Sequence, residues 1–296
     1  MKARSARAPT IDEVDANGLR LSCLRRGQGP LVLCLHGFPD TAWSFADLLE
    51  QLADAGYCAV APFMRGYAPS AVAADGDYSV TALARDVGAL IDNFGNGKAW
   101  VVGHDWGAVA AYGAAALLPG RVAGIVTAAV PPLRRFLFHP TLRQLRASHY
   151  MFKFQLPGWA ERRIPADDHA WLFRLAQSWS PDWAMPARYV EQVKAALGAP
   201  AQLRAALGYY RAIPRLLLDG DIRRAVLQPT PVPARVIYGM RDRCILPEMF
   251  SDLAPYFGAE WDRVALKDAG HFMPLEAPAA FAAAVLDFIK PRYGAP

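Results

Sequence analysis

The 296-residue sequence predicts an α/β fold with a mostly parallel sheet and an inserted helical domain. Strand-like apolar runs alternate with segments of helical periodicity along 31–130, and the alternation returns at Ala234. Between these two parts lie about a hundred residues with helical and aromatic character but no convincing strand pattern. Because alternating strands and helices connect by right-handed crossovers into a parallel sheet, we interpret the intervening segment as an insertion.

The first half of the chain supplies most of the expected sheet. The runs 18–25 and 31–35 are separated by Arg26-Gly27-Gln28-Gly29-Pro30, a turn signal that predicts a hairpin at a sheet edge. The segments that follow are expected to be a helix over 41–55, a strand over 57–61, a helix over 79–93, a strand over 99–104, a helix ending near 118 and a strand over 122–130.

Prolines mark both ends of the insertion. Pro131-Pro132 ends the first series of elements, and Pro229, Pro231 and Pro233 precede the second. We therefore expect residues 1–132 and 230–296 to form the core and residues 133–229 to form a helical cap. The pattern after the cap predicts a helix over 247–257, a strand over 263–266 and a closing amphipathic helix over 278–289.

Composition and charge exclude several classes of protein. The chain is 53% hydrophobic and 20% charged, which suits a globular protein with a large core. Its net charge of +5 comes from scattered basic residues without a basic run, so we expect neither a nucleic-acid nor a membrane partner. Residues 1–10 lack the apolar region of a signal peptide, and no run reaches the ~18 apolar residues of a membrane span. These features predict a cytoplasmic location.

The four cysteines show no spacing typical of a metal site. Cys34 and Cys58 fall within predicted buried strands, and the sequence has no C-x-x-C pair and no Cys/His cluster. We expect reduced thiols in the core, no metal and no cofactor.

The stretch Val-Val-Gly-His-Asp-Trp-Gly over 101–107 places Asp105 between two glycines where a predicted strand turns into a helix. In a nucleophile elbow of the form G-x-Nu-x-G, the flanking glycines are required because strand and helix crowd together. A carboxylate in the central position would form an alkyl ester, which points to opening of a C–O or C–halogen bond. The alternative is that Asp105 only caps the helix that follows.

Two later residues match the needs of a carboxylate nucleophile. His271 and Asp242 each follow a predicted strand, and thus lie at the carboxyl edge of the sheet where ligands bind in open α/β folds. Hydrolysis of an ester on Asp105 requires a base, and the base requires an orienting acid. The chain order nucleophile, acid, histidine is that of α/β hydrolases, so we predict a triad of Asp105, Asp242 and His271.

The turn His36-Gly37-Phe38-Pro39 follows another predicted strand. A loop in this place brings a backbone N–H to the reacting centre. We predict that the amides of Phe38 and Trp106 form the oxyanion hole.

With these motifs the sequence resembles the α/β-hydrolase superfamily, and within it the epoxide hydrolases, over essentially 18–293. The resemblance implies an eight-stranded sheet and two ring-opening tyrosines in the cap. The segment 150–158, Tyr-Met-Phe-Lys-Phe-Gln-Leu-Pro-Gly, resembles the part that carries the first tyrosine, and Gly-Tyr-Tyr-Arg over 208–211 the part that carries the second. Carried over, the pair is Tyr150 and Tyr210. The residues expected to contact substrate are Phe38, Trp106, Phe154 and Phe272.

Haloalkane and fluoroacetate dehalogenases share much of this pattern, and the tyrosine pair favours the epoxide hydrolases. An epoxide oxygen leaves as a basic alkoxide that must be protonated, whereas a halide needs no proton. The chain departs from the family at Phe63, where an Asp is common. A dehalogenase with the same nucleophile, or a catalytically silent protein that binds a small hydrophobic ligand, remain alternatives.

The resemblance thus implies hydrolysis of small lipophilic epoxides by water to vicinal diols, a detoxifying reaction, in a monomer or homodimer.

Overall fold

The computed structural model describes residues 9–216 and 218–292. Eight strands form one sheet in the order β1-β2-β4-β3-β5-β6-β7-β8, which confirms the predicted eight-stranded α/β architecture. The six strands β4, β3, β5, β6, β7 and β8 pair in parallel. Strand β2 runs antiparallel to both of its neighbours, β1 and β4. The strands are β1 (Thr10–Ala16), β2 (Leu19–Arg26), β3 (Leu31–Leu35), β4 (Cys58–Pro62), β5 (Ala99–His104), β6 (Val122–Ala128), β7 (Ala234–Gly239) and β8 (Trp261–Leu266).

The predicted hairpin between 18–25 and 31–35 is wrong. The hairpin is formed by β1 and β2, with Val14 opposite Leu21, while β2 pairs on its other side with β4. All five residues of β3 are buried, so this strand fits only in the middle of the sheet, between β4 and β5. Strand β1 is mostly polar and partly exposed, as edge strands commonly are, which gives it a weak apolar signal.

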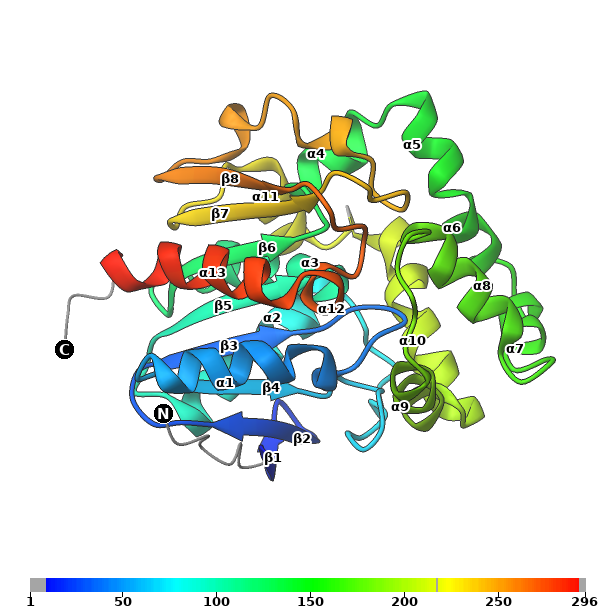
Figure 1. Ribbon diagram of the computed structural model, residues 1–296, viewed down its shortest axis with the longest axis horizontal. Coiled ribbons are helices and arrows are strands. Elements are labelled where there is room, and N and C mark those ends of the chain that lie inside the picture. The colour runs from blue at the N-terminus through cyan, green and yellow to red at the C-terminus, as the bar shows by residue number, and fades with distance from the viewer. Residues whose placement is uncertain (1–8, 217, 293–296) are drawn as a thin grey trace.

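Helices cover both faces of the sheet (Figure 1). On one face α1 packs against α13, which in turn contacts β7 and β8. On the other face α2 packs against α3, and α3 against β5 and β6. These helices are α1 (Ala46–Asp54), α2 (Val80–Phe94), α3 (Trp106–Leu117), α12 (Met273–Glu276) and α13 (Pro278–Ile289), with 3₁₀ turns η1 (Ala42–Phe45) and η5 (Lys290–Arg292).

The single helix predicted over 247–257 is also wrong. Two short 3₁₀ turns occupy this segment, η3 (Pro247–Phe250) and η4 (Ala254–Tyr256). Asp252 lies between them with a φ of 52°, a left-handed conformation that ends helical geometry. Pro255 removes a further backbone donor, so a continuous helix cannot form here.

Between β6 and β7 the described chain contains helices and no strand. The helices within 142–212 lie beyond the carboxyl ends of the parallel strands (Figure 1), whereas the last helix, over 220–227, packs against α3 and α2. The boundaries of the cap stay a prediction. The helices are α4 (Leu133–Phe138), α5 (Leu142–Ala147), α6 (His149–Phe154), α7 (Trp159–Arg163), α8 (Ala170–Trp179), α9 (Ala187–Leu197), α10 (Pro200–Ala212), the 3₁₀ turn η2 (Ile213–Arg215) and α11 (Gly220–Leu227). No helix within the described ranges is long and apolar enough to cross a membrane.

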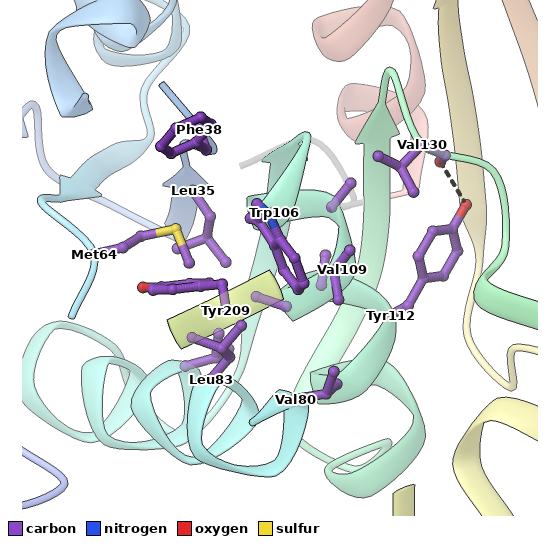
Figure 2. Close-up of a cluster of buried hydrophobic side chains, with 14 of the residues drawn as sticks. Leu35, Phe38, Met64, Val80, Leu83, Trp106, Val109, Tyr112, Val130 and Tyr209 are labelled. Atoms are coloured by element: carbon purple, nitrogen blue, oxygen red, sulfur yellow. Dashed lines mark hydrogen bonds between the residues drawn. The ribbon is translucent and has the colours of Figure 1, made fainter. Parts of the chain in front are cut away.

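Tyr209 on α10 joins this helical segment to the sheet. Its ring lies among Leu35, Met64 and Trp106 (Figure 2). Its hydroxyl donates a hydrogen bond of 2.9 Å to the backbone oxygen of Arg65, which is buried in an ion pair with Asp86. Helix α10 is thereby fixed above the carboxyl end of β5, where the elbow begins.

Candidate active site

Asp105 occupies the turn between β5 and α3, with φ 51° and ψ −117°. A Cβ on Gly103 would collide with the backbone of Gly107, and a Cβ on Gly107 would collide with the backbone of Leu35. Both glycines are therefore required by the close approach of strand and helix, as predicted for an elbow. The Asp105 side chain makes no capping hydrogen bond to α3, which contradicts the simple helix-cap alternative.

The two carboxylate oxygens of Asp105 face different groups. Oδ1 accepts a hydrogen bond of 2.7 Å from the amide of Phe38. Trp106 is the first residue of α3, so its amide is one of the N–H groups that an α-helix leaves unpaired. Oδ2 lies 3.6 Å from Nε2 of His271. The structure thus brings together the predicted nucleophile, one predicted oxyanion donor and the predicted base.

His271 is held from several sides. Its Nδ1 lies 3.0 Å from Oδ2 of Asp242, and Oδ1 of Asp242 accepts hydrogen bonds from the amides of Cys244 and Ile245. The His271 amide donates to Oγ of Ser180 over 2.7 Å. These contacts fix the imidazole with Nε2 directed at Asp105.

A second buried histidine supports the same loop. Nε2 of His104 lies 2.7 Å from the backbone oxygen of His271. Nδ1 of His104 lies 3.7 Å from Oδ2 of Asp40. Sequence reasoning assigned no part to Asp40 or His104, although Asp40 directly follows the H-G-F-P motif and His104 is the histidine of G-H-D-W-G.

The pKa values of Asp105 and His271 are shifted in opposite directions. Burial by itself raises the pKa of Asp105, but the imidazole of His271 and the Phe38 amide outweigh burial and hold it below its usual value. Burial lowers the pKa of His271, but the carboxylates of Asp242 and Asp105 outweigh this effect and raise it to about 10. The resting site is therefore an imidazolium between two carboxylates.

Tyr150 on α6 and Tyr210 on α10 lie together, with ring centroids 5.9 Å apart. The hydroxyl of Tyr150 is 3.5 Å from the thiol of Cys244. Among the described residues, no group meets hydrogen-bond geometry with the buried hydroxyl of Tyr210. Burial, followed by nearby groups that include Asp105, raises the pKa of both phenols well above the usual value. Both tyrosines are therefore neutral proton donors over the ordinary pH range.

A cavity of about 50 Å³ contains Asp105, Tyr150 and Tyr210 in its wall. Its other wall residues are Trp106, Val109, Val130, Leu133, Phe136, Leu137, Met151, Ile213, Leu216 and Ile245. Most of these apolar residues were not named from the sequence. Met151 directly follows Tyr150, and Ile213 lies about one helical turn after Tyr210. Their positions in the sequence could therefore have indicated them.

Three residues predicted to contact substrate are not among the wall residues of this cavity. Phe38 and Phe154 pack against the ring of Tyr210, with centroids 5.4 and 5.0 Å away. Phe272 packs edge-on against His271 at 5.3 Å. Trp106 lies in the wall itself. In the described parts of the chain, no group of three or more His, Cys, Asp or Glu side chains is arranged to hold a metal ion.

A family model and two curated relatives agree on the family to which the chain is similar. The family model of the α/β hydrolase fold matches residues 30–278. Epoxide hydrolase A of Mycobacterium tuberculosis is 30% identical, over 95% of this chain and 98% of that protein. An epoxide hydrolase of Caballeronia sordidicola is also 30% identical, over 94% of this chain and 93% of that protein.

A solved structure agrees with these relatives. Epoxide hydrolase A of Mycobacterium thermoresistibile superposes with a TM-score of 0.80 at 28% identity, over 95% of this chain and 98% of that one. The match spans the sheet as well as the helices between β6 and β7. The elbow geometry, the matched family model and these nearly full-length relatives show that the chain belongs to the epoxide hydrolase family of the α/β hydrolase fold.

Proposed function

We propose that this protein hydrolyses lipophilic epoxides to vicinal diols through a covalent ester on Asp105. The observation that carries the proposal is the shared cavity of one carboxylate and two phenols. The carboxylate is held ionised and both phenols are held neutral, which are the protonation states needed to attack an epoxide carbon and to protonate its oxygen. Relatives named as epoxide hydrolases support the same substrate class.

In the first step, Oδ2 of Asp105 forms a bond to one epoxide carbon while the bond from that carbon to the ring oxygen breaks. Tyr150 and Tyr210 hydrogen-bond this oxygen, and one of them supplies its proton. Among the described residues, Oδ2 receives no hydrogen bond, whereas Oδ1 is held by the Phe38 amide. Oδ2 is therefore the freer nucleophile, and Oδ1 becomes the carbonyl oxygen of the ester.

In the second step, water adds to the carbonyl carbon of the ester. Ester formation cancels the charge of Asp105, so the pKa of His271 falls and its resting proton is released to solvent. Neutral His271, oriented by Asp242, then takes a proton from the water, and the negative charge on Oδ1 is stabilised by the amides of Phe38 and Trp106. The acyl C–O bond then breaks, and the imidazolium of His271 gives its proton to the released alkoxide. The proton that the water leaves on the Asp105 carboxyl restores the phenol that was deprotonated in the first step. One water molecule is consumed and one diol leaves.

The location belongs to the same proposal. All four cysteines are buried and free of disulfides, as expected for a protein in a reducing compartment, and we propose a cytoplasmic enzyme with a role in detoxification. Its partners are the epoxide and water, without a nucleic acid.

The decisive experiment measures two products in parallel. Purified protein is given a panel of alkyl and aryl epoxides and a matched panel of haloalkanes and haloacids, and diol and halide are quantified. Diol formation that the Asp105→Asn variant lacks would support the proposal. Halide release without diol formation would assign the site to a dehalogenase, and tight binding without either product would assign it to a silent binding protein.

A further inference from the structure

Five of the nine large apolar side chains that are exposed among the described residues come from one stretch of the cap. Leu142 is 76% exposed and Phe152 is 64% exposed. We call the set the cap patch, and its members are Phe138, Leu142, Leu145, Phe152 and Leu156. Exposed apolar side chains of this size normally occur singly on a protein surface. Their concentration on α4, α5 and α6, and at Leu156 just after α6, therefore indicates a docking site.

The charges around the cap patch are almost all positive. Residues 133–160 contain no Asp or Glu, and their basic residues are Arg134, Arg135, Arg143, Arg146 and Lys153. Within the described ranges, Glu248 is the one carboxylate that pairs with this stretch, through Arg143 over 2.8 Å. The exposed Arg146 and the half-buried Lys153 have no ion pair in the described structure. The patch therefore combines exposed Leu and Phe with uncompensated cations.

The cap patch adjoins a cavity. Leu145 and Phe152 line an apolar cavity of about 270 Å³. The other three members lie within two positions of residues that also line it, which are Leu137, Pro140 and Gln155. This outer cavity shares part of its wall with the cavity that holds Asp105, and the shared residues are Phe136, Leu137, Met151 and Ile213. A shared apolar wall thus separates the cavity beside the patch from the cavity that holds the nucleophile.

We propose that the cap patch docks on an anionic lipid bilayer, with the mouth of the outer cavity facing the membrane. Helical segments that expose Leu and Phe beside Lys and Arg are typical of interfacial membrane binding, and anionic lipid attracts the basic residues. A second copy of the chain fits less well, because a symmetric contact would bring each patch's unpaired cations towards those of its partner.

The docking itself does not depend on the reaction, whereas delivery of substrate from the bilayer rests on the proposed epoxide activity. Lipophilic epoxides concentrate in membranes, and the apolar cavity would receive them without passage through water. The sequence predicted no membrane partner because its basic residues are scattered along the chain. Several of them nevertheless come from α5 and α6, the same short helices that carry the exposed Leu142, Leu145 and Phe152.

The test uses the full-length protein and no substrate. Flotation is measured with vesicles of phosphatidylcholine alone and of phosphatidylcholine mixed equally with phosphatidylglycerol, at low and high salt. We expect binding to the mixed vesicles that salt weakens, and much weaker binding to phosphatidylcholine. Leu142→Ser with Leu156→Ser, and separately Arg146→Gln with Lys153→Gln, should each reduce binding about tenfold or more. Absence of wild-type binding to either vesicle would overturn the proposal.

Matched controls come from the opposite edge of the sheet. Ile11→Ser removes an apolar side chain that is 56% exposed, and Arg20→Gln removes an exposed cation from β2, so both should bind vesicles like the wild type. Equal losses in these controls and in the patch variants would count against a localised site. If sedimentation shows a dimer that Leu142→Ser with Leu156→Ser dissociates, the patch is a contact between copies and the membrane proposal fails.

Delivery is tested separately from docking. The patch variants should hydrolyse a water-soluble epoxide in free solution at the wild-type rate. They should be slower than the wild type only on an epoxide dissolved in anionic vesicles. If the protein binds vesicles but forms no diol from any epoxide, docking stands and the proposed function fails. If diol forms but no patch variant slows hydrolysis of the epoxide dissolved in vesicles, the proposed function stands and delivery through the patch is refuted.

Discussion

Nε2 of His271 lies 3.6 Å from Oδ2 of Asp105, too far for a hydrogen bond but close enough for strong electrostatic coupling. The separation leaves the carboxylate oxygen free to attack a substrate. It also places the base where it can activate a water molecule beside the resulting ester. The proposed mechanism thus assigns ester formation to Asp105 and ester hydrolysis to His271.

Replacing His271 by Gln should permit ester formation and block ester hydrolysis, because the histidine is needed only to activate water in the second step. After exposure to an epoxide, intact-protein mass spectrometry should show an adduct equal to the substrate mass, and peptide analysis should place it on Asp105. An Asp105→Asn, His271→Gln double variant serves as the control and should remain unmodified. An inactive His271→Gln protein without any adduct would argue against two steps.

The tyrosine pair is expected to act with overlapping roles. Tyr150→Phe and Tyr210→Phe should each reduce kcat/KM by about 10²-fold, as expected for loss of one positioned acid, and the double variant should be nearly inactive on epoxides. Diol formation is measured, with circular dichroism to confirm the fold. Wild-type turnover in the double variant would remove the main argument for epoxide opening.

Neighbouring Tyr209 and Tyr210 should respond differently to the same substitution. Tyr209→Phe leaves the buried backbone oxygen of Arg65 without its donor, so it should cost about 1–3 kcal/mol of unfolding free energy with a smaller effect on kcat. Tyr210→Phe removes a hydroxyl without a protein partner in the described structure and should change stability little. Denaturant unfolding and diol assays on both variants measure this contrast, and a reversed pattern would exchange the two assignments.

The pH dependence follows from the shifted pKa values. Ester formation cancels the charge of Asp105, one of the two carboxylates that raise the pKa of His271, so this pKa should fall in the ester. Asp105 stays ionised in acid because its pKa is lowered, whereas hydrolysis requires neutral His271. The steady-state fraction of protein present as ester should therefore rise as the pH falls below neutrality.

Quenched-flow mass spectrometry across the acid and neutral range measures that fraction directly. An ester fraction that does not change with pH, or that grows towards alkaline pH, would contradict the coupling. Reference pKa values alone place an alkaline loss of activity near pH 10, where tyrosines usually ionise. Burial of Tyr150 and Tyr210 should move this loss higher, and an alkaline limb at the reference value would have another origin.

The elbow glycines should tolerate no side chain. Gly103→Ala places a Cβ against the backbone of Gly107, where no flexible group can move aside, and should destabilise the protein by about 3 kcal/mol or more. Gly120→Ala is the matched control, because a Cβ there meets nothing within 4 Å, and it should change stability by less than about 0.5 kcal/mol. Equal unfolding midpoints for the two variants would refute the steric account.

The sequence predicted the parts of the fold that local rules determine. The elbow was recognisable because Gly103 and Gly107 flank Asp105 in a known local pattern, although a Cβ on Gly107 would meet the backbone of Leu35, which is distant in sequence. The pairing of β2 was not, because the turn over 26–30 says nothing about which distant strand comes alongside. In the same way, the apolar run over 247–257 suggested a helix, while the conformation of Asp252 and the position of Pro255 divide it.

The candidate site shows a similar division. Asp105, Asp242 and His271 follow strand ends, so parallel-sheet geometry is enough to predict that they meet. Phe154 and Phe272 were predicted to contact substrate, and their rings pack against those of Tyr210 and His271. Which face of a short cap helix points into a cavity depends on tertiary packing, and a single sequence does not contain that information.

The contact between Tyr150 and Cys244 bears on the working lifetime of the protein. Epoxides alkylate thiolates, so a thiol 3.5 Å from the hydroxyl proposed to polarise the substrate is a site of potential self-inactivation. Burial first, and then the charges of Asp242 and Asp105, raise the pKa of Cys244 well above its usual value. The sulfur is thereby kept protonated and weakly nucleophilic. The acidic residues that would perform the reaction thus also protect the protein from a suicide reaction with its own substrate.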